Sequence, residues 1–276
     1  MNLGWSGVRE QLRDLYDAYY ASRDYERRYP RANHGTLAFM WRHGAARARC
    51  VLDVGCGSGR YAMPVLAAGN ARVVGCDISR AAIDAFAARL RGHRHAARVT
   101  LVHGGAEALA PQLRADCILL LFGVLSHVGP RAARVRALAE LRARAADDAR
   151  LLLSVPSIWR RRPMELMASL ADVLRGRRER WGDIAFQRDI GGHKRTFHYH
   201  LYTVAALREE LALAGWQLQA WEAESLLPEW LLTQWPALER LDLAVQPWLP
   251  AAFGYGIRAM ARATPHQRPP AEGGAA

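Results

Sequence analysis

The stretch VLDVGCGSGR, residues 51–60, joins an apolar run to three alternating glycines, Gly55, Gly57 and Gly59. This pattern predicts a buried strand that turns into a helix, and glycine lets the backbone pass close to a ligand where a Cβ would collide. Free N–H groups at the start of the helix favour a phosphate or carboxylate. A dinucleotide-binding loop, G-x-G-x-x-G, would have its third glycine at the position of Arg60, so this loop departs from that pattern.

The next apolar run, RVVGCD, ends at Asp77, about twenty residues beyond the loop, where a carboxylate can accept both hydroxyls of a ribose. The loop and the carboxylate together indicate a nucleoside that carries an anionic group. They do not by themselves separate a dinucleotide from other adenosine cofactors, although the missing third glycine disfavours a dehydrogenase.

Short apolar runs alternate with helical patterns from residue 50 to residue 156. Continuous apolar strands separated by helices are typical of parallel βαβ units that are covered on both faces. Two further strands are expected near the end of the chain, so the fold class is α/β with a sheet of seven strands. The expected strands are 50–55, 72–77, 99–104, 116–123, 149–156, 217–225 and 254–264.

The remaining segments suggest a domain organisation around this alternation. Residues 1–44 are expected to form an N-terminal helical cap, and residues 45–262 the main domain. Insertions at 157–200 and 226–250 interrupt the main domain near its C-terminal end, after strands, where α/β folds place substrate contacts. Residues 263–276, rich in Pro, Gly and Ala, are expected to form a disordered tail.

Composition limits the functional classes. Half of the 276 residues are apolar, which predicts a packed core, and no apolar run approaches the roughly 20 residues that cross a bilayer. Without a signal-like N-terminus the chain is expected to be cytoplasmic. Four cysteines lack metal-ligand spacing, so no metal site is expected. The net charge of +12 comes almost entirely from arginine, and either an RNA-facing surface or a compositional bias would explain it.

At this point the sequence resembles the class I S-adenosylmethionine-dependent methyltransferases. VLDVGCGSGR is similar to the first motif of that family, VVGCDIS to its second, HGGAEAL to its adenine-contacting turn, FGVLSHV to the loop after its fourth strand and LLLSVPS to its fifth strand. The resemblance implies a Rossmann-like, doubly wound sheet whose last strand is antiparallel. It also implies S-adenosylmethionine as the cofactor.

The resemblance assigns cofactor-binding roles to residues of these motifs. Many relatives have an acidic residue where this chain has Gly105, so Glu107 or a water would have to accept from the adenine amine. The remaining assignments are Asp53 beside the methionine amino group, Gly55, Cys56 and Gly57 in the loop, Asp77 on the ribose, Ile78 on the adenine face, the N–H of Ala106 on the adenine ring and Phe122 at the methionine end.

Methyl transfer needs an aligned nucleophile, exclusion of water and in some cases a base. His127, just past the fourth strand, and Tyr199 and His200 in TFHYHLY are the candidate catalytic residues, since a neutral imidazole is a suitable base near pH 7. The same side chains would also suit the packing of a lid. Tyrosines of the first helix, Tyr16, Tyr19 and Tyr20, are expected to cap the cofactor.

The acceptor is expected to be a small molecule with an oxygen or nitrogen nucleophile, and RNA is the alternative. The segment from GDIAFQRD to the last helix resembles the tail of wobble-uridine carboxymethyl tRNA methyltransferases. A non-catalytic scaffold is a further alternative, which the intact loop disfavours. The sequence does not indicate an oligomeric state. The arginines that would contact RNA phosphates are Arg160, Arg161, Arg162, Arg177, Arg178 and Arg180.

Overall fold

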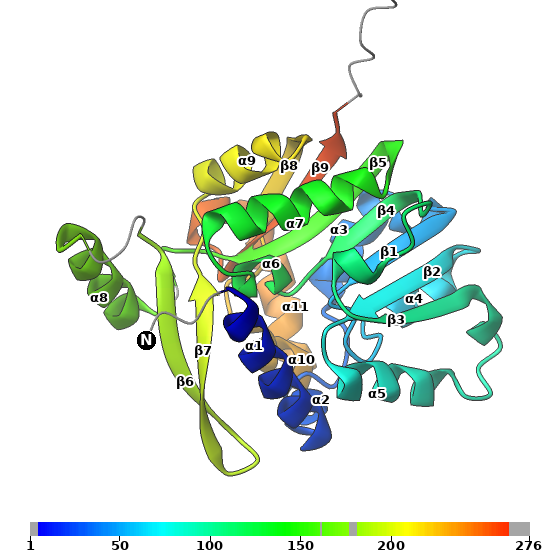
Figure 1. The fold of residues 1–276 in the computed structure, drawn as a ribbon, viewed down its shortest axis with the longest axis horizontal. Coiled ribbons are helices and arrows are strands. Elements are labelled where there is room, and N and C mark those ends of the chain that lie inside the picture. The colour runs from blue at the N-terminus through cyan, green and yellow to red at the C-terminus, as the bar shows by residue number, and fades with distance from the viewer. Residues whose placement is uncertain (1–4, 161, 177–180, 265–276) are drawn as a thin grey trace, which may run out of the picture.

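A seven-stranded sheet forms the centre of the computed structural model, which describes residues 5–160, 162–176 and 181–264. Its strand order is β3-β2-β1-β4-β5-β9-β8 (Figure 1). The first five strands in this order are parallel, whereas β9 is antiparallel to both of its neighbours, as expected from the sequence. The strands are β1 Cys50–Val54, β2 Arg72–Asp77, β3 Val99–His103, β4 Ala115–Leu120, β5 Ala145–Pro156, β8 Trp216–Ala223 and β9 Gly256–Ala263.

Helices bury both faces of the sheet. Helices α3 (His34–Arg42), α4 (Ala62–Ala68) and α5 (Arg80–Leu90) pack on one face, and α7 (Arg131–Ala143) and α9 (Val204–Leu213) pack on the other. Neighbouring residues of one strand belong to opposite cores: Val51 packs with α4, and Leu52 with α7. Because side chains alternate along a strand, the continuous apolar runs in the sequence fill both cores.

The chain forms two helices before residue 29. Helix α1 (Trp5–Ala21) ends before Arg23, whose left-handed φ of 58° redirects the chain into α2 (Asp24–Arg28). Asp17 of α1 accepts hydrogen bonds from the Ser79 hydroxyl (2.7 Å) and from the N–H of Ala81 (3.0 Å), so α1 is fastened to the start of α5.

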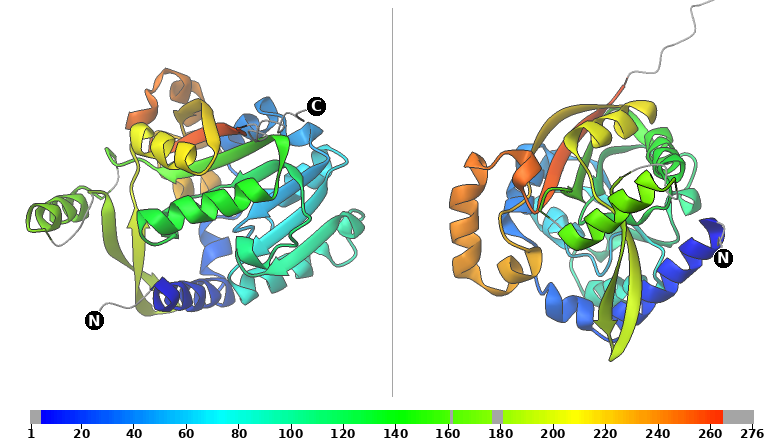
Figure 2. Two further views of the ribbon diagram at one scale, coloured as in Figure 1. Left: turned by 45° about the horizontal axis from the view of Figure 1, so that its top comes forward. Right: turned by 90° about the vertical axis from the view of Figure 1, so that its left-hand side faces the viewer.

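The first insertion contains a helix and a separate two-stranded sheet. Helix α8 (Pro163–Leu174) extends away from the body of the molecule (Figures 1 and 2). The β6–β7 hairpin (Asp183–Ile190 and His193–His200) lies beside α1, and the N–H of Gly191 at its turn donates to Asp24 (2.9 Å). The hairpin was not predicted from the sequence.

The second insertion packs against the start of α3 and the turn before it through buried acids. It comprises α10 (Glu229–Gln234) and α11 (Pro236–Val245). Glu239 accepts from the N–H of His34 (2.9 Å) and pairs with Arg31 (2.7 Å), and Glu229 accepts from the Asn33 amide (3.1 Å).

The remaining elements of the fold are short. They are α6 Val124–His127 and the 3₁₀ turns Ala45–Arg47, Ala96–Arg98, Ala106–Ala108, Gln246–Trp248 and Ala251–Phe253.

No helix in the described ranges combines the length and the apolar character that a bilayer-spanning segment requires. Residues 265–276, which make up nearly all of the expected tail, lie outside the described residues.

Candidate functional site

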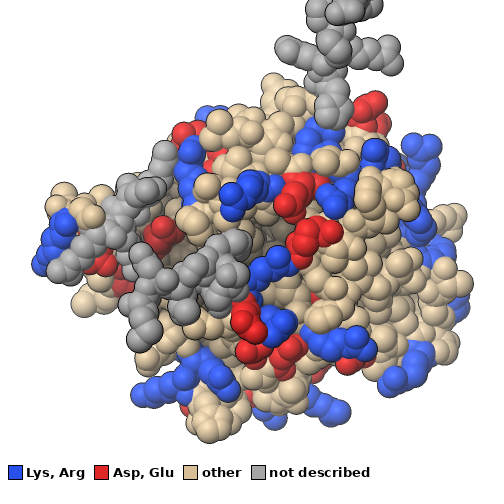
Figure 3. All heavy atoms as spheres, in the orientation of Figure 1, with Lys and Arg blue, Asp and Glu red and all other residues tan. Residues whose placement is uncertain are grey.

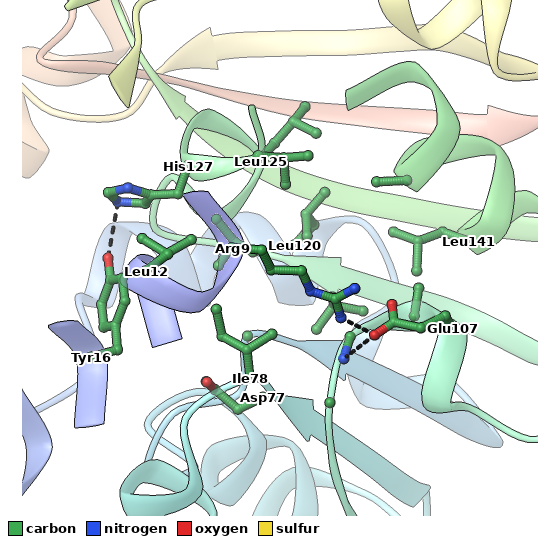
Figure 4. Close-up of a pocket in the computed structure, with 18 of the residues that line it drawn as sticks. Arg9, Leu12, Tyr16, Asp77, Ile78, Glu107, Leu120, Leu125, His127 and Leu141 are labelled. Atoms are coloured by element: carbon green, nitrogen blue, oxygen red, sulfur yellow. Dashed lines mark hydrogen bonds and ion pairs between the residues drawn. The ribbon is translucent and has the colours of Figure 1, made fainter. Parts of the chain in front are cut away.

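A cavity of about 240 Å³ lies at the carboxyl ends of the parallel strands. The ends of β1 and β2 form its floor, the turn after β3 forms one wall and α1 forms its roof (Figure 4). We call it the first cavity. Its lining includes Arg9, Leu12, Tyr16, Tyr20, Gly55, Asp77, Ile78, Ala106, Glu107, Leu120, Phe122, Leu125, His127 and Leu141.

Two glycines shape the loop at this cavity, and Gly55 exposes bare backbone to it. Gly55 has φ of 69°, and a Cβ there would lie 2.5 Å from Cγ2 of Val124. Gly57 has φ of 54°, and a Cβ there would lie 2.2 Å from the Tyr20 hydroxyl. Both positions therefore require glycine for conformation and for space. Cys56 between them is buried, and burial raises the pKa of its thiol well above the usual value, so it fills space as an unreactive thiol.

Asp77 closes the floor of the first cavity. Its Oδ2 accepts from the N–H of Gly57 (2.9 Å) and its Oδ1 from the N–H of Ser79 (2.9 Å). Each carboxylate oxygen retains a second acceptor position for a ligand hydroxyl. Burial raises the pKa of Asp77 to about 6, and these two hydrogen bonds oppose the rise.

Asp53 lies behind the loop and is 4% exposed. Burial, and then the charge of Asp77, raise its pKa to about 7. A cationic group nearby would stabilise the ionised carboxylate. Of the cofactor residues expected from the sequence, Gly55, Asp77, Ile78, Ala106 and Phe122 line the cavity, whereas Asp53, Cys56 and Gly57 support its floor from behind.

The far end of the cavity suits a flat apolar ring. Ile78 and Ala106 face a slot that Leu120, Leu125 and Leu141 continue. Glu107 forms an ion pair with Arg9 of α1 and accepts from the N–H of Gly105 (3.2 Å), so its carboxylate is engaged within the protein (Figure 4). Carboxylates beside the loop and an apolar slot at the other end fit an adenosine cofactor that also carries an amino-acid group.

A second cavity, of about 80 Å³, adjoins the first. Tyr16, Tyr25, Phe122 and His127 line both, so a ligand in one would lie next to a ligand in the other. The rest of its wall comes from α1, α2, the end of β5, the hairpin, α10 and the residues that flank β8 and β9. These residues include Tyr19, Arg28, Tyr29, Phe186, Arg188, Phe197, Tyr199, Glu224, Glu229, Trp230 and Tyr255.

Tyr16 and His127 meet where the two cavities join. The Tyr16 hydroxyl lies 2.9 Å from Nε2 of His127, and Nδ1 of His127 lies 3.1 Å from the carbonyl oxygen of His198 (Figure 4). Because a carbonyl only accepts, Nδ1 carries the hydrogen of a neutral ring and Nε2 accepts from Tyr16. Burial raises the pKa of Tyr16 well above the usual value, which keeps its hydroxyl protonated.

The two other candidate catalytic residues lie in different places. Tyr199 lines the second cavity, with its ring 4.6 Å from that of His127. His200 is buried outside both cavities, where its Nδ1 lies 2.6 Å from Asp183 and its ring packs on Tyr202. The structure therefore brings His127 and Tyr199 together, and His200 joins the two ends of the hairpin instead.

Phe122 separates the cavities in a strained conformation. Its φ is 60°, which is unusual for a bulky residue, and its N–H donates to the Ser154 hydroxyl (2.8 Å). The guanidinium of Arg60 lies 4.2 Å from the Phe122 ring and forms a buried ion pair with Glu229 (3.0 Å). Sequence reasoning noted Arg60 only as an absent glycine, because its partner is far along the chain.

Residues 51–147 match the family model described as a methyltransferase domain. A 1,6-didemethyltoxoflavin-N1-methyltransferase structure from Burkholderia thailandensis has TM-score 0.60 at 19% identity, covering 96% of this chain and 92% of that one. The CcbJ methyltransferase from Streptomyces caelestis has TM-score 0.58 at 17% identity, covering 85% and 91%. At these identities the likeness concerns the fold.

A curated relative, the tRNA U34 carboxymethyltransferase of Shewanella denitrificans, is 44% identical over 81 residues. The matched segment is 29% of this chain and 24% of that protein, so most of the relative's length has no counterpart in the match.

Proposed function

We propose that the chain is a class I methyltransferase, which transfers the methyl group of S-adenosylmethionine to an oxygen or nitrogen nucleophile of a small-molecule acceptor. Its fold and the matched methyltransferase domain support this proposal. The observation that carries this proposal is the pair of adjoining cavities. One fits an adenosine cofactor, and the other would hold an acceptor on the far side of Phe122 and the Tyr16–His127 pair.

In the first cavity the chain's residues bind and orient the cofactor. Asp77 accepts from the ribose hydroxyls, the backbone of Gly55 lies against the amino-acid part, and Ile78 packs on the adenine. When bound, S-adenosylmethionine supplies a methyl group already activated on its sulfonium sulfur, and S-adenosylhomocysteine remains after transfer. Asp53, partly protonated near pH 7, becomes ionised beside the amino group.

Tyr16 and His127 would remove a proton from the nucleophile as its bond to the methyl carbon forms. The Tyr16 oxygen accepts the acceptor's proton while its own hydrogen passes to Nε2 of His127, which leaves a neutral tyrosine and an imidazolium. The carbonyl oxygen of His198 stabilises that imidazolium through Nδ1. Helix α1 lines both cavities and the hairpin lines the second, so both elements would limit the access of water to the reacting atoms.

The second candidate is methylation of tRNA, which the local similarity to the tRNA U34 carboxymethyltransferase favours. The contacts of the surface arginines give little support to this second candidate. Arg160 donates to the carbonyl oxygens of Leu226 (3.3 Å) and Phe253 (3.5 Å), and Arg162 pairs with Glu165 (2.9 Å). Basic and acidic side chains intermingle on the face shown in Figure 3. The other candidate arginines, Arg161, Arg177, Arg178 and Arg180, lie outside the described residues.

A two-stage experiment tests the proposal. Calorimetry should show binding of S-adenosylhomocysteine and none of NADH. Labelled S-adenosylmethionine should then transfer label to a small-molecule fraction of a cell extract and not to total tRNA. Any RNA binding should weaken as salt rises without giving labelled RNA. Failure to bind S-adenosylhomocysteine would contradict the methyltransferase proposal, and labelled tRNA would select the second candidate.

A further inference from the structure

The second cavity has an aromatic wall with flat faces. Phe186 and Phe197 of the hairpin stack at 5.3 Å with an interplanar angle of 7°. Tyr16 meets the Phe197 ring edge-on at 6.2 Å, and Tyr19 at 6.5 Å. Flat apolar walls favour a planar ligand, because ring stacking adds to the burial of apolar surface.

Arg188 brings a positive charge into this wall. It projects from β6, is half-buried, and its guanidinium lies 5.2 Å from the centre of the Phe197 ring and 5.8 Å from that of Tyr19. Its NH1 donates to the Tyr19 hydroxyl at 3.3 Å. Within the described part of the chain the Tyr19 hydroxyl is its polar partner, and no carboxylate forms an ion pair with it.

Several other buried arginines of this fold have acidic partners, although Arg142 donates to the carbonyl oxygen of Thr264 instead. Arg60 pairs with Glu229 at 3.0 Å and Arg134 with Glu210 at 2.8 Å. Glu229 also lines the second cavity, but its charge is already matched by Arg60. Apart from Glu229, the charged residues that line the second cavity are two arginines, Arg28 and Arg188, and one acid, Glu224. A guanidinium partly removed from water without an anion is costly, so the cavity favours an anionic ligand.

We propose that the second cavity takes a small planar aromatic acid as the methyl acceptor. The carboxylate pairs with Arg188, the ring lies against Phe197 and Tyr19, and the hydroxyl or amino group faces Tyr16. This inference rests on the proposed function and specifies its acceptor class. The geometry supports it because Arg188 belongs to the hairpin wall, whereas Tyr16 and His127 lie where this cavity meets the first one.

The hairpin offers a matched control for Arg188. Arg195 is its direct cross-strand partner and is exposed, outside the cavity lining. Arg188→Gln and Arg195→Gln therefore remove the same charge from the same hairpin, and only the first removes it from the cavity. Arg188→Lys keeps the charge and loses the planar fork that suits a carboxylate.

The test is calorimetry on the protein saturated with S-adenosylhomocysteine, with hydroxybenzoates and aminobenzoates titrated against the matching benzamides. Acids should bind at least about tenfold more tightly than their amides, as expected for a charge-assisted pair. Arg188→Gln should abolish that preference, Arg188→Lys should reduce it and Arg195→Gln should retain it. Methyl transfer from labelled S-adenosylmethionine to the tightest acid should follow the same order.

Two results would overturn the inference: no acid binds more tightly than its amide in the wild-type protein, or Arg195→Gln loses the preference as fully as Arg188→Gln. Either result leaves the proposed function standing if S-adenosylhomocysteine still binds. Loss of S-adenosylhomocysteine binding by the wild-type protein would count against the proposed function itself.

Discussion

The two cavities share a wall but differ in how the chain builds them. The first is made mainly from the ends of neighbouring parallel strands, with residues that follow one another within short motifs such as Gly55, Asp77 and Ile78. The second is made from several elements that are distant in sequence, among them α1, α2, the end of β5, the hairpin and α10. The ends of the sheet strands determine the residues that bind the cofactor, whereas the insertions contribute residues that would bind the acceptor. Changes in the insertions could therefore alter the acceptor without altering the cofactor site.

The largest effect is expected from a side chain added at Gly55, where the glycine loop meets the first cavity. Gly55→Val should reduce S-adenosylhomocysteine affinity by at least about a hundredfold, because the left-handed φ costs about 1–2 kcal/mol and the new Cβ overlaps Val124. Gly92→Val is the matched control, with φ of 70° against 69° and no atom within 4 Å of its Cβ. Calorimetry should show normal binding by Gly92→Val. Equal losses in both variants would mean that backbone strain alone, and not the close approach at the cavity, explains the effect.

The next largest effect is expected at Asp53, the buried acid behind the glycine loop, and it concerns the free energy of unfolding. The pKa of Asp53 is raised from 3.8 to about 7, so the folded protein holds this proton more tightly than the unfolded chain. Stability from this group is therefore present below about pH 4 and is lost as the pH rises to about 7. Asp53→Asn should remove that loss, which makes the ligand-free variant more stable than the wild type at pH 8 by about 4 kcal/mol.

Denaturant unfolding at pH 5 and pH 8 measures this difference. Asp84→Asn, which changes an exposed acid of α5, serves as the control and should follow the wild-type pH dependence. A wild-type stability that rises from pH 5 to pH 8, with no difference in Asp53→Asn, would contradict the raised pKa.

The shared wall is tested by Tyr16→Phe, which removes the hydroxyl that bonds His127. We expect methyl transfer to fall by about ten- to a hundredfold while S-adenosylhomocysteine affinity stays within about threefold, because the hydroxyl serves proton transfer. His127→Gln should cost a similar amount. The double variant should be little worse than either single one, since the pair acts as a unit. Additive losses in single-turnover rates would argue against a relay.

The smallest effect concerns the roof of the first cavity. Arg9 and Glu107 form an ion pair between side chains that are 41% and 47% exposed. Exposed pairs contribute about 0–1 kcal/mol, so Arg9→Ala should weaken S-adenosylhomocysteine binding by no more than about fivefold. Salt should reduce the difference from the wild type. A loss as large as that of Gly55→Val would mean that the cofactor site is not set by the sheet alone.

The sequence predicted the sheet, and five of the eight cofactor residues that it named line the first cavity, because both depend on local patterns. The apolar runs gave all seven strands, and the glycine loop with Asp77 identified the floor of the cavity. It missed the hairpin, although Gly191-Gly192 between β-forming residues is a turn signal. It could not find the Arg60–Glu229 pair, since a contact across 169 residues leaves no spacing to recognise.

The position of His200 also could not be predicted from a local sequence pattern. An aromatic and histidine-rich stretch near the last helix suggested chemistry, but strand alternation places His198 and His200 on the face opposite Tyr199. The register of β7 against β6 then brings His200 to Asp183. Which of these side chains reaches the cavity depends on that register, which the sequence pattern alone did not supply.

Helix α1 roofs the first cavity through Arg9, Leu12, Tyr16 and Tyr20 and also walls the second through Tyr16 and Tyr19. Any exchange of nucleoside must therefore disturb the contacts of Asp17 with Ser79 and Ala81 and the ion pair of Arg9 with Glu107. One displacement would open both compartments together. We expect an ordered kinetic sequence, with the nucleoside entering first and its spent form leaving last, and a turnover number limited by the lifetime of the docked helix.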